Sequence, residues 1–318
     1  MHPFINTPFH IGSLQLPNRL IQGPLAGYSC APFRRLFSDF QSPAYCVTEM
    51  MSSYDVLHKD RPGSRFLFRA PEEKYLCYQL AGNNPAIMVA AAQKLEAIGA
   101  DCIDINCGCP KRKIRKKGAG SALLSTPSLL VDIISQIKSH IKIPLTVKIR
   151  LHGQDKSLEL ARQIYNAGAD ALIVHGRFIQ DDYNVPCQWE AIGRIKQSLP
   201  IPVIANGDIQ CRESLQQAIQ LTGCDAYMIG RAGTGKPWLY QELLSGIKQD
   251  ISFQHHVEVF MKHIEGLAEL ENSFKALLQS KSLLRYYFRP LLSGEQIRMA
   301  MNTRTLLELG RVLNLFHG

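Results

Sequence analysis

Residues 85–121 read PAIMVAAAQKLEAIGADCIDINCGCPKRKIRKKGAGS, and they contain one helix, one strand and one polar loop in succession. Four apolar residues between positions 88 and 95 recur at helical spacing, so we predict a helix from Pro85 to Ala97 that Gly99 ends. Ile103 and Ile105 alternate with polar residues, which predicts a strand over 102–106. A loop rich in cysteine and basic residues follows. The stretch indicates an α/β fold in which polar residues collect where a strand ends.

The same order of strand, polar turn and helix repeats along the chain to about residue 231. Further helices are predicted at 127–140, 158–167, 189–199 and 214–221. Strands are predicted at 19–22, 44–50, 75–80, 102–106, 145–149, 171–174, 202–205 and 226–229. This alternation favours parallel strands, and eight of them close a (β/α)8 TIM barrel. A doubly wound sheet is the alternative, but no strand-to-helix turn carries the dinucleotide motif G-x-G-x-x-G.

From about residue 251 onward the sequence predicts helices only, at 257–270, 274–288, 294–301 and 303–315. We therefore predict a barrel domain over 1–248 and a small all-helical domain over 249–318. No uninterrupted apolar run approaches the roughly 18 residues that a membrane span needs, and the N-terminal residues lack the features of a secretory signal. The expectation is a cytoplasmic monomer that enters no membrane, with no protein partner indicated.

Nine cysteines are scattered along the chain in odd number, which is not the pattern of a disulfide framework. Cys102, Cys107 and Cys109 lie close together, but their C-x4-C-x-C spacing matches neither a zinc ribbon nor the common iron–sulfur motifs. We predict reduced cysteines and no metal site.

Positive charge is concentrated at one place. The formal net charge is +9, and six of the seven residues from Lys111 to Lys117 are basic. The residues from Asp250 onward carry eight basic against seven acidic side chains, so the helical domain is nearly neutral. A basic cluster of this kind indicates a phosphate-rich partner, although a solvated surface loop is the simpler interpretation.

The basic run begins next to a candidate reactive thiol. Pro110 fixes its own backbone and pushes Cys109 toward an extended conformation at the end of the fourth predicted strand. Cys107, two residues earlier, is the competing candidate. The alternative is that neither cysteine has a chemical role.

Two glycine turns predict an anion site at the same rim. In TIM barrels the loops after strands seven and eight commonly bind phosphate, and here they read Asn206-Gly207-Asp208 and Gly230-Arg231. Lys148 and His175 lie on or after neighbouring strands. Lys148 could contact an anion, form a Schiff base, or pair with Asp104 or Glu49 in a structural role. His175 is either a ligand contact or a hydrogen-bonded core histidine.

Nine motifs together give the sequence a family resemblance. They are PLAG (24–27), TEMMSS (48–53), QLAG (79–82), DINCGCP (104–110), GSALL (120–124), VKIR (147–150), HGR (175–177), VIANGDI (203–209) and MIGRAGTGKPW (228–238). In this order they resemble the tRNA-dihydrouridine synthases, most nearly the bacterial B type. The resemblance is strong over residues 14–240 and weaker beyond.

The resemblance implies an enzyme that reduces the C5–C6 double bond of a uridine in tRNA, with bound FMN and with NADPH as reductant. It implies that Cys109 is the general acid, that Asn106 and Arg150 lie near the target uracil, and that Lys111, Arg112, Lys113 and Arg115 contact the tRNA. The helical domain would cradle the tRNA, with Arg285, Arg289, Arg298 and Arg304 as phosphate contacts. The implied cofactor-binding residues are Pro24, Leu25, Ala26, Gln79, Lys148, His175, Asn206, Gly207, Asp208, Gly230 and Arg231.

The sequence departs from the family at two places. The stretch 279–288, QSKSLLRYYF, lacks the basic residue and histidine of the B-type enzymes, and Leu25 replaces a usual methionine. The alternatives are a flavin barrel acting on a small molecule, like dihydroorotate dehydrogenase or old yellow enzyme, a catalytically silent RNA-binding relative, and an aldolase-like barrel in which Lys148 forms the Schiff base.

Overall fold

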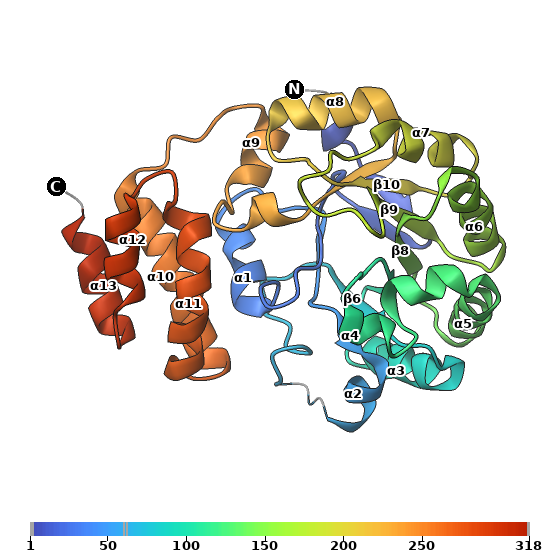
Figure 1. The fold of residues 1–318 in the computed structure, drawn as a ribbon, viewed down its shortest axis with the longest axis horizontal. Coiled ribbons are helices and arrows are strands. Elements are labelled where there is room, and N and C mark those ends of the chain that lie inside the picture. Colours follow the sequence, from blue (N-terminus) through green and yellow to red (C-terminus); the bar gives the residue numbers. More distant parts are fainter. Residues whose placement is uncertain (1–2, 60, 62, 317–318) are drawn as a thin grey trace.

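The structure is a computed structural model that describes residues 3–59, 61 and 63–316. Within these residues eight parallel strands form a closed barrel, in which β4 and β6 pair to complete the ring (Figure 1). The barrel strands are β3 (Leu20–Gln22), β4 (Tyr45–Val47), β6 (Leu76–Ala81), β7 (Cys102–Cys107), β8 (Leu145–Leu151), β9 (Ala171–Phe178), β10 (Val203–Asn206) and β11 (Ala226–Ile229). The predicted TIM barrel is confirmed, with each strand where the hydrophobic pattern indicated it.

Helices cover the outside of the barrel, as the pattern predicted. On α5 the apolar residues at helical spacing, Leu130, Ile133, Ile134 and Ile137, are buried against the sheet. Asn84 begins α3 because its side-chain oxygen accepts the Ile87 N–H at 3.1 Å. The helices of this part are α1 (Ala31–Arg35), α2 (Ser53–His58), α3 (Pro85–Ala97), α4 (Arg112–Arg115), α5 (Pro127–His140), α6 (Gln154–Asn166), α7 (Trp189–Gln197), α8 (Arg212–Thr222) and α9 (Leu239–Ser245).

The end of the barrel at which its strands begin is closed by a hairpin of β1 (Phe9–Ile11) and β2 (Leu14–Leu16). Phe9, Ile11 and Leu16 are buried in one cluster with Ile173 and Ile204 of the barrel strands. The remaining short elements are β5 (Met51–Ser52), η1 (Pro3–Asn6), η2 (Leu36–Asp39), η3 (Gly120–Ser125) and η4 (Arg231–Gly233).

Several segments differ from the prediction in their bounds or type. The fifth and sixth predicted strands are longer, because a bulge between Arg150 and Leu151 lets β8 and β9 stay paired as far as Phe178. The segment 175–177, which was expected to follow a strand, is therefore part of β9. The predicted strand 44–50 ends at Val47, and the basic run contains the one-turn helix α4.

Four further helices lie together beside the barrel, next to α1 (Figure 1). Each begins at a polar residue whose side chain accepts an N–H of the first turn, namely Ser252, Asn272, Ser293 and Thr305. They are α10 (Phe253–Leu270), α11 (Ser273–Phe288), α12 (Gly294–Met301) and α13 (Leu306–Leu315). We call them the helical bundle. Their positions confirm the predicted helical region.

The helical bundle and the barrel share a packed boundary. Cys30, Leu36 and Trp238 of the barrel part belong to the same buried cluster as Phe260 and Leu284 of the bundle. The division of the chain into domains at 248/249 stays a prediction. No helix in the described part of the chain combines the length and hydrophobicity that crossing a membrane requires.

Candidate active site

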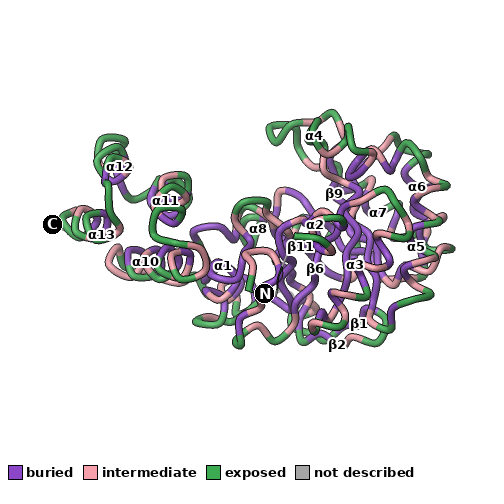
Figure 2. The backbone as a smooth tube through the Cα atoms, turned by 90° about the horizontal axis from the view of Figure 1, so that it is seen from below, coloured by how far each residue is buried: buried purple, intermediate pink, exposed green. Residues whose placement is uncertain are grey.

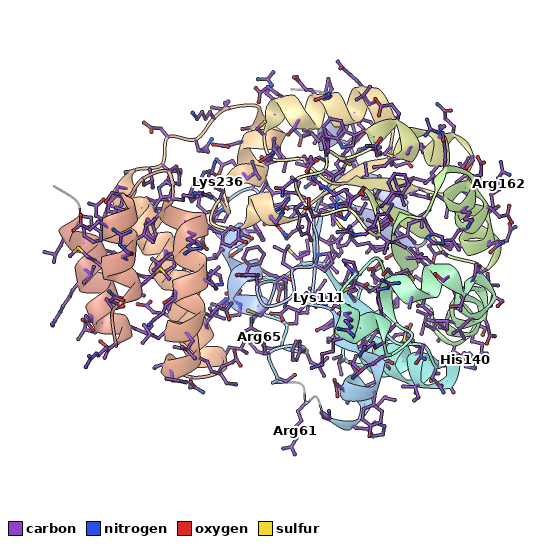
Figure 3. All side chains as sticks on the ribbon, viewed as in Figure 1. Arg61, Arg65, Lys111, His140, Arg162 and Lys236 are labelled. Carbon is purple, nitrogen blue, oxygen red and sulfur yellow. The ribbon has the colours of Figure 1, made fainter. Side chains whose placement is uncertain are left out.

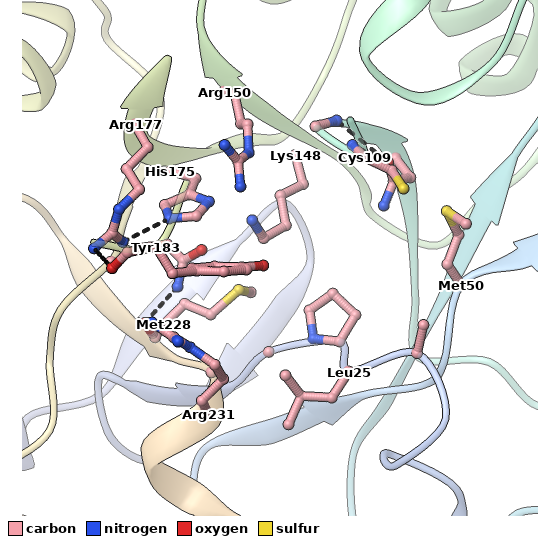
Figure 4. A pocket seen from close by; sticks show the side chains of 18 of the residues that line it. Leu25, Met50, Cys109, Lys148, Arg150, His175, Arg177, Tyr183, Met228 and Arg231 are labelled. Atoms are coloured by element: carbon pink, nitrogen blue, oxygen red, sulfur yellow. Dashed lines mark hydrogen bonds between the residues drawn. The ribbon is translucent and has the colours of Figure 1, made fainter. Parts of the chain in front are cut away.

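A cavity of about 840 Å³ opens at the carboxyl ends of the barrel strands. Cys109 and all eleven residues that the sequence suggested for cofactor binding line it, as do Asn106, Arg150 and Lys111 (Figure 4). Arg112, Lys113 and Arg115 are exposed on α4 and do not line the cavity. The structure thus brings the predicted cofactor and acid residues together and leaves most of the basic run outside.

A chain of hydrogen bonds supports the floor of the cavity. The Gln79 amide donates to Asp104 at 2.7 Å and accepts from the Asn106 amide at 2.8 Å. Asp104 also accepts the Thr146 hydroxyl at 2.7 Å. All four residues are buried, so these bonds satisfy groups that would be costly to leave unpaired. They fix the rotamers of Gln79 and Asn106 at the rim.

Asn106 also holds the turn that carries the candidate acid. Its side-chain oxygen accepts the N–H groups of Gly108 and Cys109 at 3.2 and 3.0 Å. The Cys109 carbonyl accepts the Ser121 N–H at 3.1 Å. Gly120 has φ +63°, and a Cβ there would lie 2.9 Å from the Cys109 carbonyl oxygen, so only glycine lets η3 approach this turn.

The two candidate thiols lie in different surroundings. Cys109 is half-buried and lines the cavity. Cys107 is fully buried in the barrel core, where burial and then Asp104 raise the pKa of its thiol well above the usual value. Cys109 is therefore the thiol that a molecule in the cavity can meet.

Lys148 extends its ammonium group into the cavity (Figure 4). Burial, and then Arg150, lower the pKa of Lys148 to about 8, while Asp104 opposes the shift. Burial raises the pKa of Asp104 to about 6, against Thr146, Gln79 and Lys148, which stabilise its charged form. Within the described residues Lys148 forms no ion pair or hydrogen bond, so its charge is available to a ligand.

Glu49 is not the partner of Lys148, so this sequence-based alternative is wrong. Its carboxylate binds Arg65, with Nε and Nη2 at 2.9 and 2.8 Å, and accepts the Gly27 N–H at 3.1 Å. The opposite end of the Arg65 guanidinium binds Glu271 at 2.6 Å and Gln279 at 2.9 Å, both from the helical bundle. Figure 3 shows Arg65 between the bundle and the barrel.

The glycine turns after β10 and β11 form the other end of the cavity. Gly207 has φ +127°, and a Cβ there would lie 2.8 Å from the Cys187 sulfur. Asp208 does not face the cavity as a free carboxylate, because it pairs with Arg177 at 2.6 Å and accepts the Cys187 N–H at 2.8 Å. The exposed cation at this end is Arg231.

Sequence reasoning missed Tyr183, Arg177, Tyr28 and Tyr286, which also line the cavity. The Tyr183 ring lies 4.0 Å from the Arg231 guanidinium and 5.7 Å from that of Arg177 (Figure 4). No spacing rule points to a single tyrosine in a long loop or on a distant helix. Arg177 belongs to the HGR motif at 175–177, but its ion pair with Asp208 depends on tertiary structure.

His175 is held in its neutral form. Burial, followed by the cations Lys148, Arg150, Arg177 and Arg231, lowers the pKa of its imidazole to about 2. Its Nε2 lies 3.3 Å from the Arg177 Nη1, which suits an imidazole nitrogen that accepts a hydrogen bond. His175 can therefore orient a ligand by hydrogen bonding but brings no positive charge to the cavity.

The basic run forms an exposed surface beside the cavity mouth. Figure 2 shows α4 standing out from the barrel. Of the basic side chains from 111 to 117, which the structure describes in full, Lys111 alone lines the cavity, together with the apolar Ile114. None of the six basic side chains from 111 to 117 forms an ion pair with another described residue. This surface therefore keeps its positive charge for a partner.

The fold is shared with a known flavoenzyme. The old yellow enzyme homologue from Zymomonas mobilis is similar over 79% of this chain and 96% of that protein, with a TM-score of 0.59 and 13% sequence identity. At that identity the likeness concerns the TIM barrel alone.

Sequence comparison is more specific. The family model described as dihydrouridine synthase (Dus) matches residues 21–308. The tRNA-dihydrouridine synthase B of Pseudomonas aeruginosa is 40% identical over 237 residues, which are 73% of this chain and 71% of that protein. The enzyme of the same name from Vibrio vulnificus is 32% identical over 300 residues, or 92% of this chain and 93% of that protein. The chain belongs to the dihydrouridine synthase family, whose members are flavin-dependent oxidoreductases that act on tRNA. The resemblance seen in the sequence is confirmed.

Proposed function

We propose that the protein binds FMN and uses NADPH to reduce the C5–C6 double bond of a uridine in tRNA, with Cys109 as the general acid. The observation that carries the proposal is the arrangement of the cavity. An accessible thiol lies on one wall, an unpaired ammonium group projects from the floor, and glycine turns with an arginine form one end.

The residues around the cavity fit FMN. A volume of about 840 Å³ lies within the roughly 300–1,000 Å³ of ordinary ligand sites. Gly207, Gly230 and Arg231 combine close backbone approach with positive charge, as a phosphate requires. Lys148 would then face the flavin ring and favour electron density on it. When bound, the flavin would supply the hydride that adds to C6 of uracil.

Reduction of the double bond also needs a proton at C5, and this is the role we assign to Cys109. A general acid must keep its proton until charge develops on the uracil, and it must be replenished from solvent afterwards. The Cys109 thiol is half-buried at the cavity wall on a turn fixed by Asn106, so it is placed to meet both a uracil in the cavity and solvent. Of the six basic side chains from 111 to 117, Lys111 lines the cavity and the others lie on the outer surface.

Transfer RNA suits the charged surface. A stacked uridine must leave its neighbours to enter the cavity, and single-stranded loops make this less costly. The basic run would bind phosphates near the mouth, and Arg285, Arg289, Arg298 and Arg304 of the helical bundle would bind phosphates farther away. All four are exposed.

The test is tRNA that lacks dihydrouridine, incubated with the FMN-loaded protein and NADPH. Mass spectrometry should find a uridine that has gained two hydrogens. FMN released on denaturation should be identified by chromatography. If tRNA binds but never gains hydrogen, the protein is instead a silent RNA-binding relative.

Two cysteine variants test the acid. Cys109→Ala should retain FMN and NADPH oxidation while tRNA reduction falls about 10²- to 10⁴-fold, the usual contribution of a general acid. Cys107→Ala is the matched control and should reduce tRNA at nearly the normal rate, with some loss of stability. An equal loss in both variants would contradict the assignment of Cys109.

A further inference from the structure

The helical bundle contributes one described residue to the cavity. Tyr286 of α11 lines the mouth, whereas every other lining residue lies between positions 23 and 234. Its side chain is 39% exposed. The neighbouring residues Tyr287 and Phe288 are buried, and the Tyr287 hydroxyl lies 3.0 Å from Nδ1 of His263. The helix therefore places two aromatic side chains in its core and presents the third to the cavity.

Tyr286 does not stand alone at the mouth. Its ring meets that of Tyr28 edge to face, with centroids 5.7 Å apart and planes at 67°. Tyr28 is half-buried and also lines the cavity. Arg231 and Tyr183 are close enough to act electrostatically on the Tyr286 hydroxyl. An aromatic pair from two parts of the chain thus lies beside the anion end of the cavity.

Close contacts with the barrel hold this pair in position. A Cβ on Gly235 would lie 2.5 Å from the Tyr286 carbonyl oxygen, so α11 touches the backbone after η4 directly. About two turns nearer the start of α11, the Gln279 amide donates to the Gly27 carbonyl at 2.9 Å and accepts from Arg65 at 2.9 Å. The position of Tyr286 is therefore fixed relative to Pro24, Leu25 and Ala26.

We propose that Tyr286, supported by Tyr28, is a stacking site for a nucleobase next to the uridine that enters the cavity. The inference rests on the proposed function, because it takes RNA as the substrate. Extruding a base leaves its neighbours partly unstacked, and an aromatic side chain at the mouth restores a stacking partner. Arg285 of α11 and Arg289, which follows the end of that helix, are both exposed and supply positive charge for phosphates farther along the same RNA.

Alanine at position 286 removes the ring. Base stacking on an aromatic side chain contributes enough that KM for tRNA should rise about 5- to 150-fold in Tyr286→Ala. KM for NADPH should rise far less. Tyr286→Phe keeps the ring and should restore the KM for tRNA, whereas Tyr286→Leu keeps apolar area without a ring and should not. Phe274→Ala is the matched control, because Phe274 is an aromatic residue of α11 that is 70% exposed and lies outside the cavity.

A spectroscopic test follows the base itself. A short RNA with 2-aminopurine beside the target uridine should lose fluorescence on binding to the normal protein and to Tyr286→Phe, but not to Tyr286→Ala or Tyr286→Leu. Equal fluorescence loss in all four, with unchanged KM for tRNA, overturns the stacking site and leaves the proposed function intact. A rise confined to KM for NADPH overturns it as well, because the ring would then serve the reductant. If the normal protein reduces no tRNA, the proposed function fails first.

Discussion

The charge on Lys148 should control cofactor affinity, and pH is the perturbation that reveals it. The ammonium group projects into the cavity with a pKa lowered to about 8, first by burial. Below about pH 7 it carries a proton and attracts an electron-rich ring or an anion. As the pH rises through 8 the proton is lost, so affinity for FMN should fall with increasing pH.

The magnitude follows from the fraction of protein that carries the proton. If only the charged form binds well, the apparent dissociation constant rises about tenfold per pH unit above the pKa, which gives about 30-fold between pH 7 and 9.5. One hydrogen bond to a charged group contributes about 1.5–3 kcal/mol, or roughly 10- to 150-fold in affinity. The predicted loss of affinity for FMN, about 30-fold, lies within this range.

Quenching of FMN fluorescence at a series of pH values measures the effect. The affinity of the normal protein for FMN should begin to fall near pH 8. Lys148→Arg should bind FMN equally well throughout the range, and Lys148→Met should bind it weakly at every pH. The reasoning is refuted if the normal protein shows no pH dependence, or if Lys148→Met binds FMN as tightly as the normal protein at pH 7.

Four other measurements test the remaining arguments. Asp104→Asn should move the break in FMN binding below pH 8, because Asp104 raises the pKa of Lys148; a break at higher pH would contradict this. The flavin-free protein should lose stability as the pH falls below 6.5, because burial lowers the pKa of His175 and His263 to about 2 and about 3, and the unfolded chain therefore binds protons that the folded chain does not. The free energy of unfolding, followed by circular dichroism as the pH is lowered, should fall by about 1.4 kcal/mol per pH unit for each histidine. A free energy of unfolding that does not change with pH would refute this prediction. Arg65→Met should lower the free energy of unfolding, measured by chemical denaturation, by about 3 kcal/mol, because it leaves Glu49 buried without a cation. Arg65→Lys should restore part of this loss. A loss below about 1 kcal/mol would show that the Arg65 contacts matter little for stability. Changing Arg112, Lys113 and Lys116 to Gln should lower the salt dependence of tRNA binding by about one unit of slope for each lost phosphate contact. Arg162→Gln, at the outer edge of α6 away from the helical bundle, should change nothing (Figure 3).

The barrel was predictable because its signals are local. Helical spacing and strand alternation occur within short windows, and eight repeats leave few topologies. Cavity residues at strand ends, such as Lys148 and Asn206, were predictable for the same reason, since the carboxyl ends of barrel strands meet at one rim. Pro24, Leu25 and Ala26 were named only because of the family resemblance. Cys109, on the turn after one strand, and Lys148, on the next strand, could be named as rim residues in this way.

The remaining features depend on contacts between distant segments. The register shift between β8 and β9, where residues 176 and 177 of β9 are extra, lets β9 run on through His175 and Arg177, and no local pattern marks such a shift. Glu49 was only one of the possible partners offered for Lys148, and its actual partner, Arg65, lies in a loop without periodicity. Tyr286 reaches the cavity only because α11 packs on the barrel, 51 residues after the nearest glycine that it touches. Such pairings are set by tertiary packing and not by residue spacing.

The junction around Arg65 limits how the chain can be recombined. One guanidinium joins Glu49 of the barrel to Glu271 and Gln279 of the helical bundle, and the same contacts reach Gly27. A chimera that exchanges residues 249–318 for those of a relative would separate these partners, even though the cut falls in an apparent linker. An engineer who wants to transfer substrate choice between such enzymes would need to move positions 27, 49 and 65 together with the bundle. The unit of exchange is a surface of contact, and it does not coincide with a continuous length of sequence.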